Sequence, residues 1–219
     1  MKISSETIKI LQNFSTINQS IIFKVGNIQK TISPQKNIFA EAVIKEEFPV
    51  ECGIYELPKF LNAISLFEDP DLNFQSNFVE ITSTKNYSKI RYYYASPTLI
   101  ISPPDKSISG IEEVDSFSLD QDTLSKLSKA ALIMGVSDFV IESNSKERVI
   151  KTCNTKNKSS NVFSVTQKIK SGSEYTVVVN NDNLKIIPND YNLVVGKIKG
   201  TTLVQFVSDS VKYWISAEA

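Results

Sequence analysis

The same order of structural patterns occurs twice along this chain of 219 residues. Residues 5–17 carry apolar side chains at helical spacing, and residues 121–134 do so again in the second half. Each of these helical patterns is followed by short β-prone runs, a second short helix and three further β-prone runs. The duplication predicts two similar α+β domains of about 100 residues each, and a domain of that size can bury a core of its own.

The two sets of expected elements agree in order and, in places, residue by residue. In the first half we expect helices at 5–17 and 58–67 and strands at 20–25, 38–44, 50–55, 72–75, 78–83 and 88–95. In the second half we expect helices at 121–134 and 182–187 and strands at 138–142, 147–153, 162–169, 175–179, 191–196, 202–207 and 211–217. The run Ile90–Ala95 aligns with Val211–Ser216, and Leu72 aligns with Leu193. These matches indicate that one domain was copied and then diverged.

Apolar spacing also predicts which side of each helix is buried. The expected buried residues are Ile8, Leu11 and Phe14 in the first helix, Phe60, Leu61, Ile64 and Leu66 in the second, and Leu124, Leu127, Ala131 and Met134 in the third. The fold class that follows is a duplicated α+β fold, in which each domain packs two helices on antiparallel sheets.

A proline-rich stretch separates the two halves. Residues 96–116 contain Pro97 and the pair Pro103-Pro104, a composition that disfavours helices and strand ladders and suits an extended connector. The apolar run Leu99-Ile100-Ile101 within it needs a surface to cover. Connectors of this length are often functional. We expect an N-terminal domain at 1–97, a connector at 98–116 and a C-terminal domain at 117–219.

The composition argues against catalysis and against a bound cofactor. The chain has no histidine, which removes the most common general base and imidazole ligation of a metal. The nearest approach to a phosphate loop, Gly196 to Gly200, lacks the terminal Lys-Ser/Thr. Cys52 and Cys153 lie far apart and form no CxxC pair, so we expect neither a metal site nor a disulfide. We expect a non-enzymatic protein of a reducing cytosol, without a signal peptide or a membrane-spanning segment.

The placement of lysine suggests contact with nucleic acid. Formal charge is zero, from 24 Lys+Arg against 24 Asp+Glu, so any such attraction depends on where the cations lie. Lysines fall on the polar sides of the expected helices, whereas Glu6, Asp122 and Asp182 fall in first turns, where the helix macrodipole favours them. The ordinary alternative is a solvated helix face. If the helices share one surface, their lysines would meet phosphates in a sequence-independent and salt-sensitive way.

Three other motifs have a structural explanation that is simpler than a chemical one. Asp69 and Asp71 could bind a metal ion, but they lie in an acidic turn that contains a proline. Ser143 and Lys146 have the spacing of a Ser-Lys nucleophile, but they fall in an expected hairpin turn. The run Tyr92–Tyr94 could stack on bases, but it also reads as a strand with alternating burial. We expect Trp214 and both cysteines to be buried.

Four segments taken together resemble the DNA polymerase sliding clamps of T-even-type bacteriophages. They are LQNFSTIN at 11–18, GIYELPKFLNAISL at 53–66, YNLVVGKIKG at 191–200 and VKYWISAEA at 211–219. The resemblance runs over nearly the full length, and the connector and several hairpins diverge from it. It implies a DNA-clamp fold, assembled as a homotrimeric ring of six similar domains with helices inside and sheets outside.

The resemblance also implies partners. The ring would encircle duplex DNA as a processivity factor in the cytoplasm of the infected bacterial host. An ATP-dependent clamp loader would place it there, and an apolar pocket at the connector would capture partner tails such as the C-terminal tail of the DNA polymerase.

Roles for individual residues follow from the same resemblance. The residues implied to face DNA are Lys9, Gln12, Lys59, Lys126, Lys129 and Lys185, and Gln12 is neutral where a cation would strengthen the attraction. Those implied for the partner pocket are Ile100, Ile101, Pro103, Leu193, Val204 and Ile215. Those implied for strand edges that join subunits are Arg91, Tyr92, Tyr93, Phe163 and Val165.

Two other classes of function remain open from the residues alone. A structural protein of a virus particle could share the duplication and the pairing of edge strands. A carboxylate-based hydrolase would need two acids that converge in a pocket, and no motif predicts such convergence. Helix lysines that lie away from acids favour the clamp over both alternatives.

Overall fold

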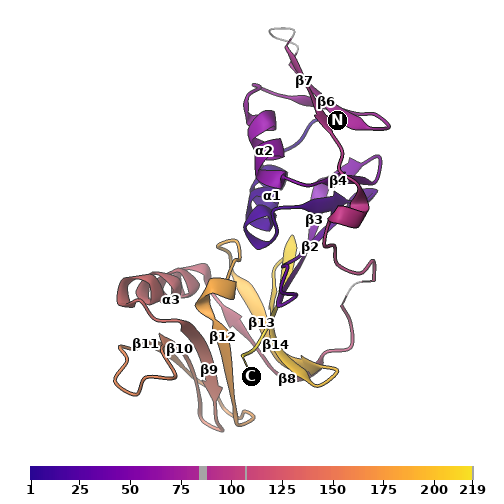
Figure 1. Ribbon diagram of the computed structural model, residues 1–219. Coiled ribbons are helices and arrows are strands. Elements are labelled where there is room, and N and C mark those ends of the chain that lie inside the picture. Colours follow the sequence, from indigo (N-terminus) through magenta and orange to yellow (C-terminus); the bar gives the residue numbers. More distant parts are fainter. Residues whose placement is uncertain (84–87, 107, 219) are drawn as a thin grey trace. The chain divides into compact units, whose positions relative to one another are not determined.

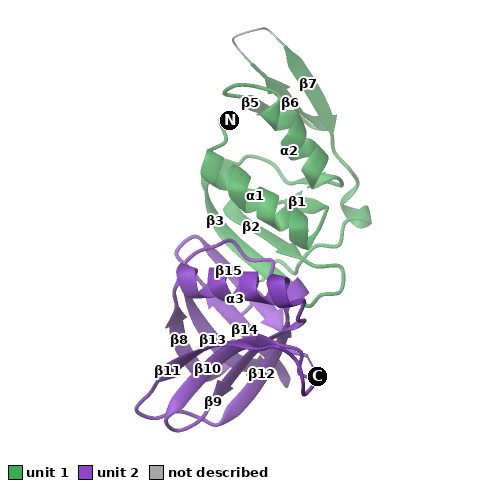
Figure 2. Cartoon of the chain, turned by 90° about the vertical axis from the view of Figure 1, so that its left-hand side faces the viewer, with its two compact units in different colours: residues 1–107 green, residues 108–219 purple. Residues whose placement is uncertain are grey.

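The computed structural model describes residues 1–83, 88–106 and 108–218 (Figure 1). Residue 107 of the expected connector and residue 219 of the expected C-terminal domain lie outside the described residues. The chain divides into two compact units, residues 1–107 and 108–219, coloured green and purple in Figure 2. Each unit combines helical segments with antiparallel strands, so the expected α+β class is confirmed.

The first unit contains two helices, seven strands and one 3-10 turn among its described residues. In chain order they are α1 (Ser5–Ile17), β1 (Ile21–Phe23), β2 (Gly26–Ile32), β3 (Ile38–Phe48), β4 (Cys52–Ile54), α2 (Leu57–Ser65), β5 (Asp71–Phe74), β6 (Phe78–Thr82), β7 (Lys89–Tyr93) and η1 (Pro97–Leu99). Strand β1 pairs with β4, β2 pairs with β3, and β5, β6 and β7 form a meander, all antiparallel.

Helix α1 has the bounds expected from its apolar spacing. The Ser4 side chain caps its N-terminus by accepting a hydrogen bond from the Thr7 backbone N–H. The buried stripe runs through Ile10, Leu11 and Phe14, whereas Ile8, expected in that stripe, is only half-buried. The buried stripe is therefore rotated slightly from the expected one, since it includes Ile10, which was not predicted, in place of Ile8.

Helix α2 begins one residue earlier than expected and ends two residues earlier. Pro58 lies in its first turn, where a missing backbone N–H costs nothing. Phe60, Leu61 and Ile64 are buried as expected, but Leu66 follows the last helical residue and is exposed. The prediction of Leu66 on the buried side was wrong, because the helix ends before that residue.

Strand β2 was not expected, because its sequence lacks apolar alternation. The strand carries Gln29 and Lys30 among its central residues. Gln29 is nevertheless fully buried, since its side-chain amide donates to the backbone carbonyls of Lys24 and Gly26 and accepts from the Lys24 N–H. A polar residue whose hydrogen bonds are satisfied can occupy a core position, and periodicity does not reveal it.

The second unit contains one α-helix, eight strands and a 3-10 turn among its described residues. In chain order they are β8 (Glu112–Leu119), α3 (Gln121–Met134), β9 (Asp138–Ser143), β10 (Glu147–Cys153), β11 (Phe163–Lys168), β12 (Tyr175–Asn180), η2 (Asn181–Asn183), β13 (Tyr191–Ile198), β14 (Thr201–Val207) and β15 (Val211–Ser216). One sheet has the order β11-β10-β9-β12, and β8, β13, β14 and β15 are paired in that order.

Strand β8 occupies the end of the segment expected to be the connector. Residues 112–116 belong to this strand, which pairs with β13 along its length. The prediction of an extended connector up to residue 116 was therefore wrong at its end. Residues 112–116 already belong to the strand, but apolar alternation is visible in the sequence only from Phe117 to Leu119.

Helix α3 has the expected bounds and reproduces the cap of α1. Asp120 accepts a hydrogen bond from the Thr123 N–H, as Ser4 does from Thr7 in the first unit. Gly135 ends the helix in the left-handed conformation, with φ 63°, which a residue without Cβ adopts at no steric cost. Leu124, Leu127 and Ala131 are buried as expected, and Met134 is half-buried.

The helix expected at 182–187 is absent, and this part of the prediction was wrong. The segment forms only the 3-10 turn η2, in which the Asn180 side chain accepts from the Asp182 N–H. Asparagine and aspartate side chains offer the backbone such local bonds in place of helical ones. Pro188 then disfavours helical geometry at Ile187, whose N–H donates to the Tyr213 hydroxyl.

A buried ion pair joins the two sheets of the second unit. The Arg148 guanidinium, on β10, donates to Asp115 Oδ2 of β8 from Nε at 3.1 Å and from Nη2 at 2.5 Å. The Tyr175 hydroxyl of β12 donates to the same oxygen at 2.7 Å, and Arg148 Nη1 donates to Gln167 Oε1 of β11. The guanidinium also lies 3.9 Å from the ring centroid of Phe117. One arginine thus contacts strands from both sheets.

We predict that Arg148→Met lowers the free energy of unfolding by about 3–5 kcal/mol, because it leaves the Asp115 carboxylate buried without its cation. The double variant Arg148→Met/Asp115→Leu should recover most of that loss, since both charges are then gone. The control is Lys45→Met, which breaks an exposed pair with Glu6 and should leave the free energy of unfolding nearly unchanged. Equal losses for the two single variants in urea denaturation would contradict the assignment.

Candidate nucleic-acid and partner interfaces

The polar side of α1 carries two of the residues assigned to DNA. Lys9 and Gln12 are both exposed, since the other side of the helix is buried in the first unit. Within the described residues, Lys9 forms no ion pair with a carboxylate. Its ammonium is therefore available to an external anion.

Two other helix lysines pair with acids on their own helix. Lys59 Nζ lies 2.6 Å from Glu56 Oε1, and Lys126 Nζ lies 2.6 Å from Asp122 Oδ2. These hydrogen bonds raise the pKa of both lysines, so both stay charged at neutral pH. The sequence argument that helix lysines lie apart from acids was wrong at these positions, because Glu56 at the N-cap of α2 and Asp122 in the first turn of α3 lie one helical turn before them.

The last two lysines of the set have different settings. Lys129 is exposed on α3 and forms no ion pair among the residues that the structure describes. Lys185 is exposed too, but it lies in the loop after η2, because the helix expected to carry it does not form. Helices α1, α2 and α3 therefore present five of the six residues assigned to DNA, and a loop presents the sixth.

The expected partner pocket is not formed by the residues named for it. Leu193, Val204 and Ile215 are 0% exposed, and they lie in the core of the second unit, where no ligand can reach them. Ile100 is buried as well. Only Ile101, 46% exposed, and Pro103 remain accessible for contact. The prediction was wrong for the strand residues, because a β-prone apolar run does not show which of its faces borders a cavity.

A hollow in the first unit contains Pro103 in a different setting. It has a volume of about 350 Å³ and lies between strands β1 and β2 and the connector. Its lining residues are Ile22, Lys24, Val25, Ile28, Lys30, Ser102, Pro103, Pro104 and Asp105. Val25 and Ile28 are exposed apolar residues of its lining. Lys24 bridges Glu51 at 3.0 Å and Asp105 at 3.1 Å, so the rim is charged and the interior is apolar.

The connector is fixed to the first unit beside this hollow. Asn18, at the C-terminus of α1, donates from Nδ2 to the carbonyls of Ile32 at 2.9 Å and Ile101 at 3.0 Å. Gly53 faces the connector so closely that an added Cβ would lie 2.9 Å from Ile100 Cδ1 and 2.8 Å from the Ala95 carbonyl oxygen. The hollow is thus preformed, since the connector that forms one of its walls is held by its close packing on Gly53 and by the hydrogen bond from Asn18.

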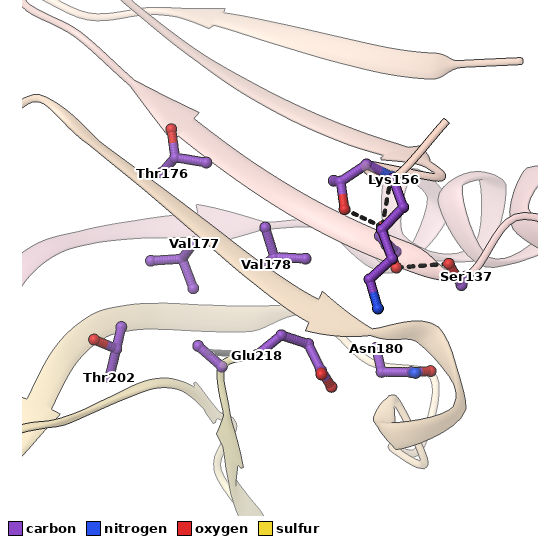
Figure 3. Close-up of a pocket in the computed structure, with 11 residues that line it drawn as sticks. Ser137, Lys156, Thr176, Val177, Val178, Asn180, Thr202 and Glu218 are labelled. Carbon is purple, nitrogen blue, oxygen red and sulfur yellow. Dashed lines mark hydrogen bonds between the residues drawn. The ribbon is translucent and has the colours of Figure 1, made fainter. Parts of the chain in front are cut away.

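A second hollow, in the second unit, is polar (Figure 3). It has a volume of about 430 Å³ and lies along β12. Its lining residues are Ser137, Asp138, Thr155, Lys156, Thr176, Val177, Val178, Asn180, Thr202, Ala217 and Glu218. The Asp138 carboxylate accepts hydrogen bonds from the Ser137 hydroxyl and from the Thr155 N–H and hydroxyl, which hold the start of β9 and the following loop together.

Strand β7 is an edge of the first unit's meander, since among the described residues it pairs only with β6. Tyr92 packs under α2, with its ring 5.2 Å from that of Phe60 and its hydroxyl donating to the Glu56 carbonyl. Tyr93 points the other way, is 65% exposed and lies 5.5 Å from the Phe78 ring. The alternating burial expected for Tyr92–Tyr94 is confirmed for this pair.

Strand β11 is an edge of its sheet, since within the described part of the chain it pairs only with β10. Phe163 and Val165 lie opposite Thr152 and Ile150 and are half-buried. Helix α3 contacts this strand and β10. Both edges thus offer an unpaired row of backbone groups with apolar side chains on one face.

The other motifs have structural roles. Asp69 pairs with Lys2, and Asp71 pairs with the N-terminal ammonium at 2.6 Å, which holds the pKa of Asp71 below its usual value. No group of three or more potential metal ligands occurs among the described residues. Ser143 and Lys146 flank a hairpin turn, closed by the Asn144 N–H and the Glu147 carbonyl. Burial raises the pKa of the Cys52 thiol to about 12, so this cysteine is an inert core residue.

No helix in the described ranges combines the length and apolarity needed to span a membrane.

We predict that Asn18→Ala frees the connector without unfolding the first unit. Loss of the two donated hydrogen bonds should speed amide hydrogen exchange roughly 10-fold at Leu99 and Ile100, whose N–H groups donate to Ser96 and Pro97. Exchange in β9 of the second unit should not change. The control is Gln19→Ala at the exposed neighbouring position. Unchanged exchange in the connector of the Asn18 variant would contradict the anchoring role.

Comparison with known proteins shows which proteins this chain is similar to. The model of the family described as DNA polymerase processivity factor matches residues 4–102. The sliding clamp of Vibrio phage KVP40 is 27% identical over 225 residues and covers 100% of both chains. The sliding clamp of Escherichia phage RB69 is 28% identical over 231 residues, which is 100% of this chain and 97% of that protein.

The fold agrees with the sequence relatives. The proliferating cellular nuclear antigen from Entamoeba histolytica superposes with a TM-score of 0.72 at 11% identity, and the match covers 100% of this chain and 98% of that one. Sliding clamps are not enzymes, and the matches give no support to a structural protein of a virus particle. The resemblance to sliding clamps of T-even-type phages and the duplicated clamp fold expected from the sequence are confirmed: residues 4–102 match the processivity-factor model, and sliding clamps of three phages match over the whole chain.

Proposed function

We propose that this sliding clamp closes as a homotrimeric ring around duplex DNA and keeps the replicative polymerase attached to its template. The observation that carries the proposal is the exposure of lysines on the polar sides of α1, α2 and α3, each of which is buried on its other side. A surface of this kind meets the phosphate backbone and does not read base edges.

The contact with DNA is weak, because few lysines on the helices that the structure describes are unpaired and the net charge is zero. Lys9 and Lys129 are free to meet phosphates, whereas Lys59 and Lys126 must exchange an exposed carboxylate for a phosphate. Such exposed pairs contribute little stability, so the exchange costs little. The zero net charge adds no long-range attraction. Closure of the ring, and not affinity, therefore retains the duplex, and a weakly held duplex can slide.

Ring closure uses the two open strand edges. Pairing of β7 from one copy with β11 from the next would extend both sheets by main-chain hydrogen bonds. Tyr92 on one edge and Phe163 and Val165 on the other would supply apolar contacts on the helix-bearing face. Arg91 and Tyr93, on the opposite face of β7, would border the same junction. Repetition of one such contact can close a ring, and three copies is the number that the sequence resemblance implies.

Partner tails would bind in the hollow between β1, β2 and the connector. An apolar interior and a charged rim suit a short segment with an apolar anchor, such as the C-terminal tail of the DNA polymerase. Ile101 and Pro103 lie on the connector side of this surface. We propose that an ATP-dependent clamp loader opens and closes the ring, and that the protein works in the cytoplasm of the infected host.

We predict that the double variant Lys9→Glu/Lys129→Glu lowers loader-dependent processivity of the cognate polymerase by at least about 10-fold, because it places anions beside phosphates. These two lysines are chosen because, among the described residues, neither pairs with a carboxylate of the chain, so charge reversal breaks no ion pair. The measurement is product length on primed circular DNA at two salt concentrations.

The control for this experiment is Lys212→Glu, a charge reversal at an exposed position of strand β15. It should leave product length unchanged. Thermal unfolding should be alike for all three proteins. Normal processivity of the double variant at both salt concentrations would refute the assignment of α1 and α3 to the DNA surface.

We predict that Val165→Asp converts the trimer to monomers, because it places a charge in the apolar part of the strand edge. Sedimentation equilibrium across concentration measures the mass. The matched control, Thr166→Asp, changes the exposed neighbour on the other face of β11 and should leave the trimer intact. A wild-type protein that stays monomeric at all concentrations, or a trimer in the Val165 variant, would exclude this edge as the junction.

A further inference from the structure

The two units differ in what lies beside their first helix. In the first unit α2 packs against α1, and the two helices lie side by side (Figure 2). In the second unit the corresponding segment forms only the turn η2, so α3 has no helical neighbour among the described residues. The duplication therefore leaves a helix position that the second unit does not fill.

The correspondence between α1 and α3 is close enough to compare positions. Both helices begin with the same cap, in which Ser4 or Asp120 accepts from the backbone N–H three residues later. Counted from the cap, Ile17 of α1 corresponds to Ile133 of α3. Ile17 is 3% exposed, whereas Ile133 and its neighbour Leu132 are each 84% exposed. A large apolar side chain is thus kept on α3 at a position that is buried in α1.

A hollow lies beside η2, the turn that replaces the second helix. It has a volume of about 430 Å³ and opens between the C-terminal half of α3 and η2. Ala131, Leu132, Val136 and Leu184 give it an apolar wall. Exposed apolar surface of this kind marks an interaction site when it is contiguous and rimmed by polar groups. Ser128 and Asn181 form such a rim.

The charges beside the hollow favour an acidic occupant. Lys129 is exposed on α3, within one turn of Leu132, and among the described residues it has no carboxylate partner. Lys126 lies one turn further back and pairs with the exposed Asp122, which an incoming carboxylate can replace. The hollow itself is bordered by one acid, Asp182. An occupant with glutamates along one flank would complement the two lysines of α3.

We infer that this hollow binds an amphipathic helix of a partner protein, with an apolar side and an acidic flank, in the position that α2 holds in the first unit. A helix of about the length of α2, nine residues, fills such a site through anchors at i, i+3, i+4 and i+7. The inference depends on the fold of the second unit and not on the proposed function.

The test uses a stapled, fluorescent helical peptide of 12 residues with leucine and phenylalanine at the spacing of Leu57, Phe60, Leu61 and Ile64 and glutamate elsewhere. Fluorescence anisotropy against the full chain measures binding. We expect Leu132→Ser/Ile133→Ser to weaken binding by at least about 10-fold and Lys129→Glu to weaken it in a salt-dependent way. Both leucine and isoleucine are exposed, so their replacement does not unfold the helix.

Two controls isolate the site. Leu66→Ser removes an exposed apolar residue of the first unit and should leave binding unchanged. A peptide with lysine in place of glutamate should bind at least about 10-fold more weakly. The inference is overturned if the acidic peptide does not bind the wild-type protein, or if it binds the Leu132/Ile133 variant equally well. It is also overturned if that variant changes the mass of the assembly, since a second copy of the chain would then be the occupant.

Discussion

Each helix of this protein buries one side against the body of its unit, and that burial determines what the other side can do. Ile10, Leu11 and Phe14 hold α1, and Leu124, Leu127 and Ala131 hold α3. The cost of exposing these stripes to water fixes the rotation of each helix about its axis. Lysines on the opposite side of each helix therefore face solvent. Packing of the core thus produces a surface that carries lysines although the net charge is zero. Such a surface attracts phosphates at contact distance but little beyond it.

The two units solve the same folding problem with different details. Pairings β2–β3 and β1–β4 of the first unit correspond to β10–β11 and β9–β12 of the second, so the strand neighbours survived the duplication. The second unit has a full strand, β8, where the first has only the bridge of Lys2 with Asp71 before its first helix, and the buried pair of Arg148 with Asp115 fastens β8. It also lacks the second helix. Copies of one domain can therefore keep the pairing of their strands while their surface elements are lost or lengthened. Strand pairing depends on main-chain groups, which nearly every residue carries.

The sequence predicted long periodic elements well and short polar ones poorly. Helices at 5–17 and 121–134 have the expected bounds, because their apolar repeats and their cap residues agree. The helix at 182–187 does not form, because local side-chain bonds and Pro188 outweigh a weak apolar pattern. Strand β2 was missed, because Gln29 is buried through its hydrogen bonds and so breaks the alternation. At the site, the exposure of Lys9 and Lys129 was predictable, whereas the acids that pair with Lys59 and Lys126 required helix geometry.

The sequence by itself determined the duplication, the α+β class, the absence of histidine chemistry and the resemblance to sliding clamps, because these depend on residue identity and order. Only the tertiary structure decided which apolar residues are available to a partner. Leu193, Val204 and Ile215 are as apolar as Val25 and Ile28, yet the first three lie in a core and the last two border a hollow. Strand periodicity gives two faces but does not say which of them another element covers. That depends on contacts between residues far apart in the chain, as when Asn18 fixes Ile101 of the connector.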